Sequence, residues 1–248
     1  MYRRLILGAV LTLLAVSPAA AQEVTGAQVY IAYYQVGFDD LEDYIGLFQQ
    51  NDVPILQELQ EEGVIAGFGL QMHNTAGEYN IRFAVRSDDW ASFGDFWSEY
   101  LGRSEQRHPR DFERASEMLQ AHTDEIWDIT SSNVPTGQQF TYMYDSKFQV
   151  AFSEMEAWNA AWTADMVPML DQAIADGILG GWVIENHNTG GPDNWKILYL
   201  FESWDTIDDL FGRILPAAMG NPRLKALMGS AVQAHDDIIW ETVPPSGN

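Results

Sequence analysis

Four of the five histidines in this 248-residue chain occur in two repeated contexts, and one of these contexts could support acid–base chemistry. His122 and His235 lie in the segments QAHTDEIW and QAHDDIIW, each two residues before an aspartate, Asp124 or Asp237. Residues i and i+2 of a β-strand share a face, so each carboxylate can orient its imidazole. Because imidazole changes charge near neutral pH, we predict these four residues as candidate catalytic groups. A structural alternative is that both rings stabilise the C-terminus of a preceding helix.

The other two histidines of the repeated contexts, His73 and His187, precede turns in the similar segments QMHNTAG and ENHNTGG. Asn, Thr and Gly are typical of hairpin turns, so one interpretation is that the motif only builds a hairpin. The other interpretation is that His73 and His187 bind a ligand, together with Arg82 and Lys196 from the strands that follow. The sequence is compatible with both.

No cofactor or metal is expected. His and Asp are good metal ligands, but here they lack the dense spacing of a metal site, and haem ligation by His122 or His235 is not favoured. The chain has no cysteine and no G-x-G-x-x-G, P-loop or H-E-x-x-H motif. His108 stands alone in HPR, and Asn221 replaces it in the matching NPR. We therefore interpret His108 as a helix N-cap.

The repeated histidines belong to a longer internal repeat. Residues 53–90 align without a gap to residues 167–204, and eleven of the 38 positions are identical. With a shift of one residue, the segments around His122 and His235 align as well. A period near 114 residues is far longer than a solenoid repeat and has the size of a small domain. The sequence therefore predicts two copies of one unit.

Each unit has the pattern strand–helix–strand–strand–helix–strand. β-branched and aromatic runs indicate the strands, and helical apolar spacing indicates the helices. Pro54 falls inside the first helix, where we expect a kink or a break near Asn51 and Asp52. In the first unit we predict strands at 29–36, 64–73, 79–86 and 122–129 and helices at 39–62, 88–101 and 108–121.

This order is the ferredoxin-like βαββαβ arrangement, in which helices cover one face of a four-stranded antiparallel sheet and leave the other bare. The expected fold class is α+β, with one unit at 28–130 and a second at 139–243, packed face to face as one barrel. We expect Arg82, His122 and Asp124 to line the bare face, with Lys196, His235 and Asp237 at the matching places. Two interpretations of such a face are a solvent-filled cleft and an internal salt-bridge network.

A pseudo-twofold axis between the units sets the second strand of one antiparallel to the fourth strand of the other. We therefore expect two clusters across the boundary: His73 with His235 and Asp237, and His187 with His122 and Asp124. The expectation depends on register, because a slip of one residue turns a side chain to the other face.

The segments VPILQELQEEGVIAGFGLQMHN and VPMLDQAIADGILGGWVIENHN resemble the helix–glycine–strand passage of the dimeric α+β barrel superfamily, in its antibiotic-biosynthesis-monooxygenase, EthD and NIPSNAP-like branches. The resemblance covers both units. It implies that two halves of one chain form a barrel that other members build as homodimers. It does not fix a function, because this superfamily includes cofactor-free oxygenases, cyclases, haem proteins and members without a known activity.

The N-terminus is expected to direct export. Arg3 and Arg4, an apolar run over 5–16 and the small residues at 19–21 indicate a signal peptide over residues 1–21 and a periplasmic or secreted protein. The formal net charge of −23 argues against nucleic acid and anionic membranes as partners. Because the two halves are expected to pair within the chain, we expect a monomer.

Three functional hypotheses follow from these features. The first is a protein that binds a small, partly aromatic molecule in a cleft of the barrel. The second is a cofactor-independent oxygenase, isomerase or cyclase that uses His and Asp for proton transfer. The third is a structural or partner-binding protein without a small-molecule site.

Overall fold

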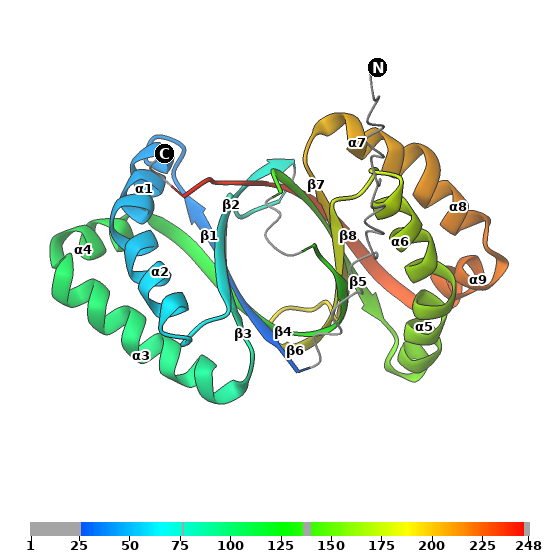
Figure 1. Cartoon of the computed structure of the whole chain (residues 1–248), viewed down its shortest axis with the longest axis horizontal. Coiled ribbons are helices and arrows are strands. Elements are labelled where there is room, and N and C mark those ends of the chain that lie inside the picture. The colour runs from blue at the N-terminus through cyan, green and yellow to red at the C-terminus, as the bar shows by residue number, and fades with distance from the viewer. Residues whose placement is uncertain (1–25, 76, 136–139, 246–248) are drawn as a thin grey trace, which may run out of the picture.

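The structure, a computed structural model, describes residues 26–75, 77–135 and 140–245, and the expected signal peptide lies outside them. Its strands form a closed antiparallel barrel in the order β1-β3-β2-β8-β5-β7-β6-β4 (Figure 1). The strands are β1 (Gln28–Val36), β2 (Gly67–Thr75), β3 (Ile81–Ser87), β4 (Leu119–Asn133), β5 (Tyr142–Val150), β6 (Gly181–Thr189), β7 (Trp195–Phe201) and β8 (Val232–Thr242). The expected mixed α+β barrel is therefore confirmed.

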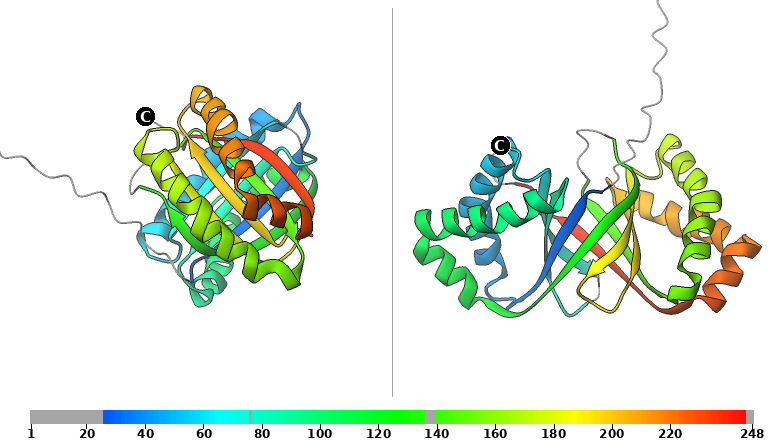
Figure 2. Two further views of the ribbon diagram at one scale, coloured as in Figure 1. Left: turned by 90° about the vertical axis from the view of Figure 1, so that its right-hand side faces the viewer. Right: turned by 90° about the horizontal axis from the view of Figure 1, so that it is seen from below.

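Helices cover the barrel on two opposite sides (Figures 1 and 2). The first half, residues 26–135, contributes α1 (Leu41–Leu47), η1 (Phe48–Asp52), α2 (Val53–Glu61), α3 (Trp90–Arg107) and α4 (Pro109–Glu117). The second half, residues 140–245, contributes η2 (Phe152–Glu154), α5 (Met155–Ala161), η3 (Trp162–Met166), α6 (Val167–Ala175), α7 (Trp204–Asp209), η4 (Leu210–Ile214), α8 (Leu215–Gly220) and α9 (Pro222–Ser230). Within the described residues, no helix is long and apolar enough to cross a membrane.

Strand pairing has the same register in both halves. In the first half, β1 pairs with β3 so that Gln28 faces Ser87, and in the second half β5 pairs with β7 so that Tyr142 faces Phe201. Tyr142 lies 114 residues after Gln28, and Phe201 lies 114 residues after Ser87. The barrel closes through two seams between the halves, β2 with β8 and β4 with β6. Each half therefore supplies four strands, and neither sheet has a free edge in the closed barrel.

Proline shapes the helices next to the barrel. The kink expected near Asn51 is a π-helical turn, η1, in which the amide of Val53 donates to the carbonyl of Phe48, five residues earlier. Pro54 follows directly and cannot donate the next helical hydrogen bond. η3 and η4 likewise end two residues before a proline, Pro168 or Pro216. π-Turns are frequent at functional sites, and η1 lies beside the cavity described below.

The core has three parts. Two clusters lie between a sheet face and its helices, one in each half. A third cluster lies inside the barrel and draws on strands of both halves: Val29, Ile31, Tyr33, Trp127, Met143, Leu198 and Trp240. Trp127 and Trp240 are fully buried there. The two sheets therefore cover each other's inner faces, as expected from the sequence.

Charged side chains share the barrel interior with this third cluster. Six of them are almost fully buried, namely Arg82, Glu125, Asp145, Lys147, Glu185 and Lys196. Lys147 pairs with Glu125 at 2.9 Å, and Lys196 pairs with Glu185 at 2.7 Å. The Nζ atoms of Lys147 and Lys196 each lie 4.3 Å from an aromatic ring centroid, that of Tyr33 or Trp127. Of the two interpretations offered for this face, the interior forms the internal salt-bridge network.

The expectation that His122 and Asp124 line the barrel interior is wrong. Along β4, Ile126 packs with the helix-side cluster of the first half, whereas Trp127 packs inside the barrel. Strand alternation therefore puts His122 and Asp124 on the helix side, and β8 places His235 in the same way. Both faces of these sheets are buried, so hydrophobicity does not distinguish the inner face from the outer one.

Candidate functional site

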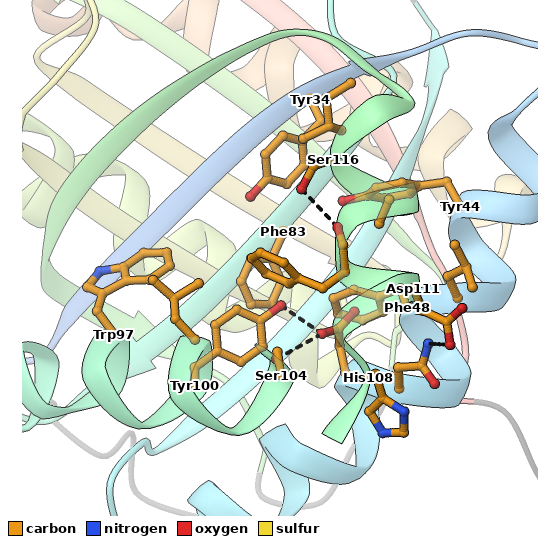
Figure 3. Close-up of a pocket in the computed structure, with 17 residues that line it drawn as sticks. Tyr34, Tyr44, Phe48, Phe83, Trp97, Tyr100, Ser104, His108, Asp111 and Ser116 are labelled. Carbon is orange, nitrogen blue, oxygen red and sulfur yellow. Dashed lines mark hydrogen bonds between the residues drawn. The ribbon is translucent and has the colours of Figure 1, made fainter. Parts of the chain in front are cut away.

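A cavity of about 180 Å³ lies in the first half, between the sheet and the helices (Figure 3). We call it the inner cavity. Its walls come from β1, β3, α1, η1, α3, α4 and the start of β4: Tyr34, Tyr44, Leu47, Phe48, Asn51, Asp52, Phe83, Trp97, Tyr100, Leu101, Ser104, His108, Asp111, Phe112, Ala115, Ser116 and Leu119. Most of this lining is aromatic or aliphatic, and the polar groups are few. This composition is typical of small-molecule sites.

Asp52, at the end of η1, is the half-buried carboxylate of the inner cavity. The hydroxyl of Tyr100 donates to its Oδ1 at 3.0 Å, and the hydroxyl of Ser104 lies 3.5 Å from the same atom. Burial raises the pKa of Asp52 to about 6, although these two hydrogen bonds and the nearby His108 act to lower it. Asp52 therefore titrates close to neutral pH, where a general base is most effective.

Local structure explains how these groups meet. Tyr100 and Ser104 are four residues apart on α3 and so share one helix face. Stacking against Phe96, with ring centroids 5.4 Å apart, holds Tyr100 in place. The π-turn η1 offsets the helical register just before α2 and directs Asp52 toward α3.

A second, wider cavity of about 510 Å³ adjoins the first, and we call it the outer cavity. Tyr34 and Trp97 line both cavities. The predicted pair of His122 and Asp124 lines the outer cavity. Within this pair, His122 Nε2 lies 3.0 Å from Asp124 Oδ2. The hydroxyl of Tyr30 donates to the other carboxylate oxygen of Asp124 at 2.6 Å, and the ring of Tyr34 stacks on His122. The first half thus presents an oriented imidazole beside an aromatic cavity.

The second half completes the outer cavity. The turn after β6 brings Thr189 and Gly190 into its wall. Gly190 has a positive φ of 88°, and a Cβ atom there would lie 2.2 Å from the carbonyl oxygen of Asp124. His187 Nε2 hydrogen-bonds to the carbonyl oxygen of Gly190, so this histidine holds the turn. In β6 the His-Asn-Thr-Gly motif therefore builds a hairpin that docks beside the His122–Asp124 pair.

The expected clusters across the half–half boundary do not form. Seam β2–β8 places His73 opposite Trp240, and seam β4–β6 places His187 opposite Trp127. Each of these tryptophans lies five residues beyond the strand's own histidine, a separation of about 16 Å along the strand. The direction of the strands is as expected, but the register brings the hairpins, and not the histidines, toward the two His–Asp pairs.

The second half has the corresponding pair, His235 and Asp237. His235 Nε2 lies 3.0 Å from Asp237 Oδ1 and 3.0 Å from the hydroxyl of Ser146. Because one ring nitrogen meets both groups, this is not the relay of a serine hydrolase, which uses both nitrogens. The hydrogen bond with Asp237 raises the pKa of His235. Burial acts to raise the pKa of Asp237, but hydrogen bonding, first of all from His235, outweighs it and leaves the pKa lowered.

The predicted binding residues Arg82 and Lys196 lie inside the barrel. The guanidinium of Arg82 donates to Gln71 at 2.7 Å, and Lys196 pairs with Glu185. Desolvation lowers the pKa of Lys196 despite that partner. Neither residue lines the inner or the outer cavity.

Sequence reasoning missed the residues of the inner cavity. His108 is the N-cap residue of α4 but makes no side-chain capping hydrogen bond, and it lines the cavity. Asp52 falls on a helix whose apolar face packs on the sheet. A signal for it exists in the repeat, because the position 114 residues later is the fully buried Met166. A carboxylate at a position whose counterpart in the other half is buried core indicates a residue that does not serve packing.

In the second half, tryptophans stand at two positions that line the inner cavity and at one position on the neighbouring strand. Tyr44 and Phe48 of the cavity wall are replaced by Trp158 and Trp162, and Ile81 of β3 is replaced by Trp195. The rings of Trp158, Trp162 and Trp195 contact one another with centroids 4.6 to 5.7 Å apart, and all three are buried. Helix-side space in the second half is thus filled by tryptophan.

The described residues contain no group of three or more His, Asp or Glu side chains placed to hold a metal ion. The two cavities contain a carboxylate whose pKa is raised to about 6, an imidazole oriented by a carboxylate, tyrosine hydroxyls and aromatic walls. These groups can bind a small molecule and move a proton.

The sequence matches no family model and no curated protein. Solved structures do match, and the three described here share 8–13% of their residues with this chain. A putative monooxygenase from Lactobacillus acidophilus has 13% identity and a TM-score of 0.59, over 88% of this chain and 94% of that chain. A second one, from Fusobacterium nucleatum, has 8% identity and a TM-score of 0.61, over 89% and 94%.

A mutant chlorite dismutase from Candidatus Nitrospira defluvii, in complex with cyanide, has 12% identity and a TM-score of 0.53, over 89% of this chain and 92% of that chain. At such low identity these structures show a shared fold and nothing of the activity. The chain therefore shares its closed α+β barrel fold with them, which is consistent with the resemblance stated from the sequence.

Proposed function

We propose that this protein binds a small, partly aromatic molecule in the first half, with its buried end in the inner cavity and its other end in the outer cavity. The observation that carries the proposal is Asp52, a carboxylate with a raised pKa set among aromatic walls. A packed structural core would hold an apolar residue there, as the second half does with Met166. A perturbed carboxylate in a concave apolar pocket is the usual signature of a binding or active site.

The second half provides a test of this proposal, because it shows which side chains fill the same space. Tyr44→Trp combined with Asp52→Met copies the second half and should close the inner cavity while the barrel still folds. Native mass spectrometry of wild-type and variant protein, each purified from its own cells, compares the retained small molecules. A molecule retained by the wild type and lost by the variant supports the proposal. Retention of the same molecule by both proteins contradicts the proposal. The control variant Trp158→Tyr changes only the second half and should retain the molecule, so its loss there also contradicts the proposal.

A second candidate function is cofactor-independent acid–base catalysis, as in an oxygenase, isomerase or cyclase. It is favoured by the pKa of Asp52 near 6 and by the His122–Asp124 pair 3.0 Å apart at the adjoining cavity. Two of the structural neighbours are named as monooxygenases, which adds an analogy at the level of the fold. Once a ligand is identified, turnover that is lost in Asp52→Asn while binding persists would favour catalysis over binding alone.

We also propose that the chain is a tandem duplication of one βαββαβ unit and that it is monomeric. Eleven identities in 38 positions and the matching strand register of the halves support the duplication. The two halves already close one barrel, so a second chain is not required for closure. Light scattering on the purified protein should give the mass of one chain, and a dimer mass contradicts this part of the proposal.

Finally, we propose that the protein is exported with removal of residues 1–21. Arg3, Arg4 and the apolar run that follows support this proposal, and the lack of cysteine means that it does not depend on disulfide formation. N-terminal sequencing of the protein from the native cell envelope should begin at Gln22. An intact Met1 on the exported protein contradicts it.

A further inference from the structure

Acidic side chains outnumber basic ones around the inner cavity. Two carboxylates, Asp52 and Asp111, and the imidazole of His108 line it, and none of its lining residues is a lysine or an arginine. Nδ2 of Asn51 donates to Asp111 at 3.1 Å. The chain as a whole carries a formal charge of −23, which raises the local concentration of cations and repels anions. An anionic ligand would meet two carboxylates in this cavity and neither a lysine nor an arginine.

Asp52 has bonding capacity left over. Its Oδ1 takes the hydroxyls of Tyr100 and Ser104, while Oδ2 has no hydrogen-bond or ion-pair partner among the described residues. Asp52 is half-buried, and no ion pair of this carboxylate with a cation is seen among the described residues, although His108 is near enough to lower its pKa. Partial burial of a carboxylate without a paired cation is unfavourable, and a positive ligand would relieve that cost.

Aromatic rings surround this carboxylate. Phe48 and Phe83 contact each other with centroids 5.5 Å apart, and Tyr100 lies 6.2 Å from Phe83 (Figure 3). Tyr44 and Trp97 complete the wall. Rings grouped around an acidic residue are the arrangement that recognises ammonium groups, because each ring face attracts positive charge. The volume of about 180 Å³ is comparable to cavities that hold a single benzene molecule, so it suits a compact head group.

The second half shows that these features change together. Met166 stands where Asp52 stands, and Leu224 stands where Asp111 stands. Both belong to the buried cluster that contains Trp158, Trp162 and Trp195. Where the second half has a packed apolar cluster, both carboxylates are absent, which links the acidic groups to the cavity and not to the fold.

We propose that the ligand of the inner cavity is an organic cation, a protonated or quaternary amine whose head group lies between Asp52 and the aromatic wall. This inference rests on the proposed function and narrows it to a ligand class. The head group contacts Oδ2 of Asp52, and its apolar or aromatic body extends past Tyr34 and Trp97 into the outer cavity.

Choline and 3,3-dimethyl-1-butanol test this inference, because they differ only in the positive nitrogen. Titration calorimetry should give at least tenfold tighter binding for choline. Asp52→Asn should weaken choline binding by tenfold or more and leave the alcohol within about twofold, since the shape is retained. Asp165→Asn, which removes a charge from the equivalent π-turn of the second half, should change neither, and thermal unfolding checks that each variant is folded.

Equal affinity for the two probes, or tighter binding of the alcohol, overturns the cation inference and leaves the small-molecule site standing. Equal losses in Asp52→Asn and Asp165→Asn also overturn it, because they indicate general charge attraction. Failure of both probes to bind at millimolar concentration, with no molecule retained by the protein from its own cells, counts against the inference and the proposed function together.

Discussion

The two halves of the molecule share a strand register and differ in where they place charge. On the helix side, the first half keeps a cavity with Asp52 in its wall, and the second half fills the same space with Trp158, Trp162 and Trp195. Inside the barrel the contrast is reversed. The second half contributes Asp145, Lys147, Glu185 and Lys196, whereas the matching first-half residues are Ile31, Tyr33, Gln71 and Arg82.

This contrast shows how one scaffold divides its tasks. The second half supplies four of the six buried charges and has the densely packed aromatic outer face. The first half supplies the other two, Arg82 and Glu125, and has the open, carboxylate-bearing outer face. Packing and the Lys196–Glu185 pair stabilise the second half, so the first half can carry groups that do not serve stability. The hairpin of the second half also docks on the first half beside Asp124, so the supporting half completes the open cavity.

Separating the halves should have the largest effect. Expressed alone, residues 22–132 and 136–248 each expose an inner sheet face bearing Trp127 or Trp240, which the full chain buries completely. We expect neither piece to be a folded monomer, because one uncovered apolar face leaves too little burial to stabilise the sheet. Circular dichroism with thermal melting measures this. A sharp transition in either monomeric piece breaks the claim of mutual cover.

Within the barrel, Lys196→Met should destabilise the protein by about 3–5 kcal/mol, because it leaves Glu185 buried without a cation. The matched change in the first half, Arg82→Met, should cost less, about 1–3 kcal/mol, because its partner Gln71 is neutral. Urea unfolding curves of both variants give the difference. If Lys196→Met lowers the free energy of unfolding by no more than Arg82→Met does, the Lys196–Glu185 pair does not distinguish the two halves.

Each hairpin contains a glycine with a positive φ, Gly190 in the second half and Gly77 in the first, and their substitutions can be compared. Gly190→Ala should destabilise the protein by more than 2 kcal/mol, since a methyl group would meet the backbone of Asp124 in addition to the cost of a positive φ. Gly77→Ala carries the positive φ but makes only ordinary contacts, with the flexible end of Ile238 at 3.5 Å and the carbonyl oxygen of Tyr79 at 3.8 Å, so about 1 kcal/mol is expected. The same unfolding measurement compares them. NMR of His122 should shift only for Gly190→Ala, and a shift for Gly77→Ala alone would remove the role given to the second hairpin.

The pH dependence of stability should report Asp52. Its folded pKa of about 6 lies above the unfolded value of 3.8, so the unfolded chain releases this proton first as the pH rises. The free energy of unfolding therefore falls between about pH 4 and 6, by ~1–3 kcal/mol from this group, and stays lower above that window. Asp52→Asn should remove this fall and be more stable than wild type at pH 7 and similar at pH 4. A variant less stable at both pH values would show that the charged carboxylate supports the fold.

Much of the architecture could be predicted from the sequence. The repeat of residues 53–90 and the strand patterns predict the element order and the mutual cover of two sheets. The proline at position 54 predicts a disturbance near Asn51, although a π-turn replaces the expected kink. The face of His122 could not be predicted, because both sides of β4 are buried and alternation alone does not name the inner side.

The site was predictable only in part. The His122–Asp124 and His235–Asp237 pairs follow from spacing along one strand, and both form at 3.0 Å. The partners across the seams depend on a register between distant strands, which local sequence does not encode. Asp52 escaped prediction because it lies on a packing helix, and only comparison with Met166 of the other copy singles it out.

A crystal structure of the protein purified from its own cells tests the central claim most directly. The account predicts electron density for a compact molecule in the inner cavity, within contact distance of Asp52, Tyr100 and Phe83, and none among Trp158, Trp162 and Trp195. Density inside the barrel or in the second half, or an inner cavity closed by its own side chains, would contradict the assignment of the binding site to the first half.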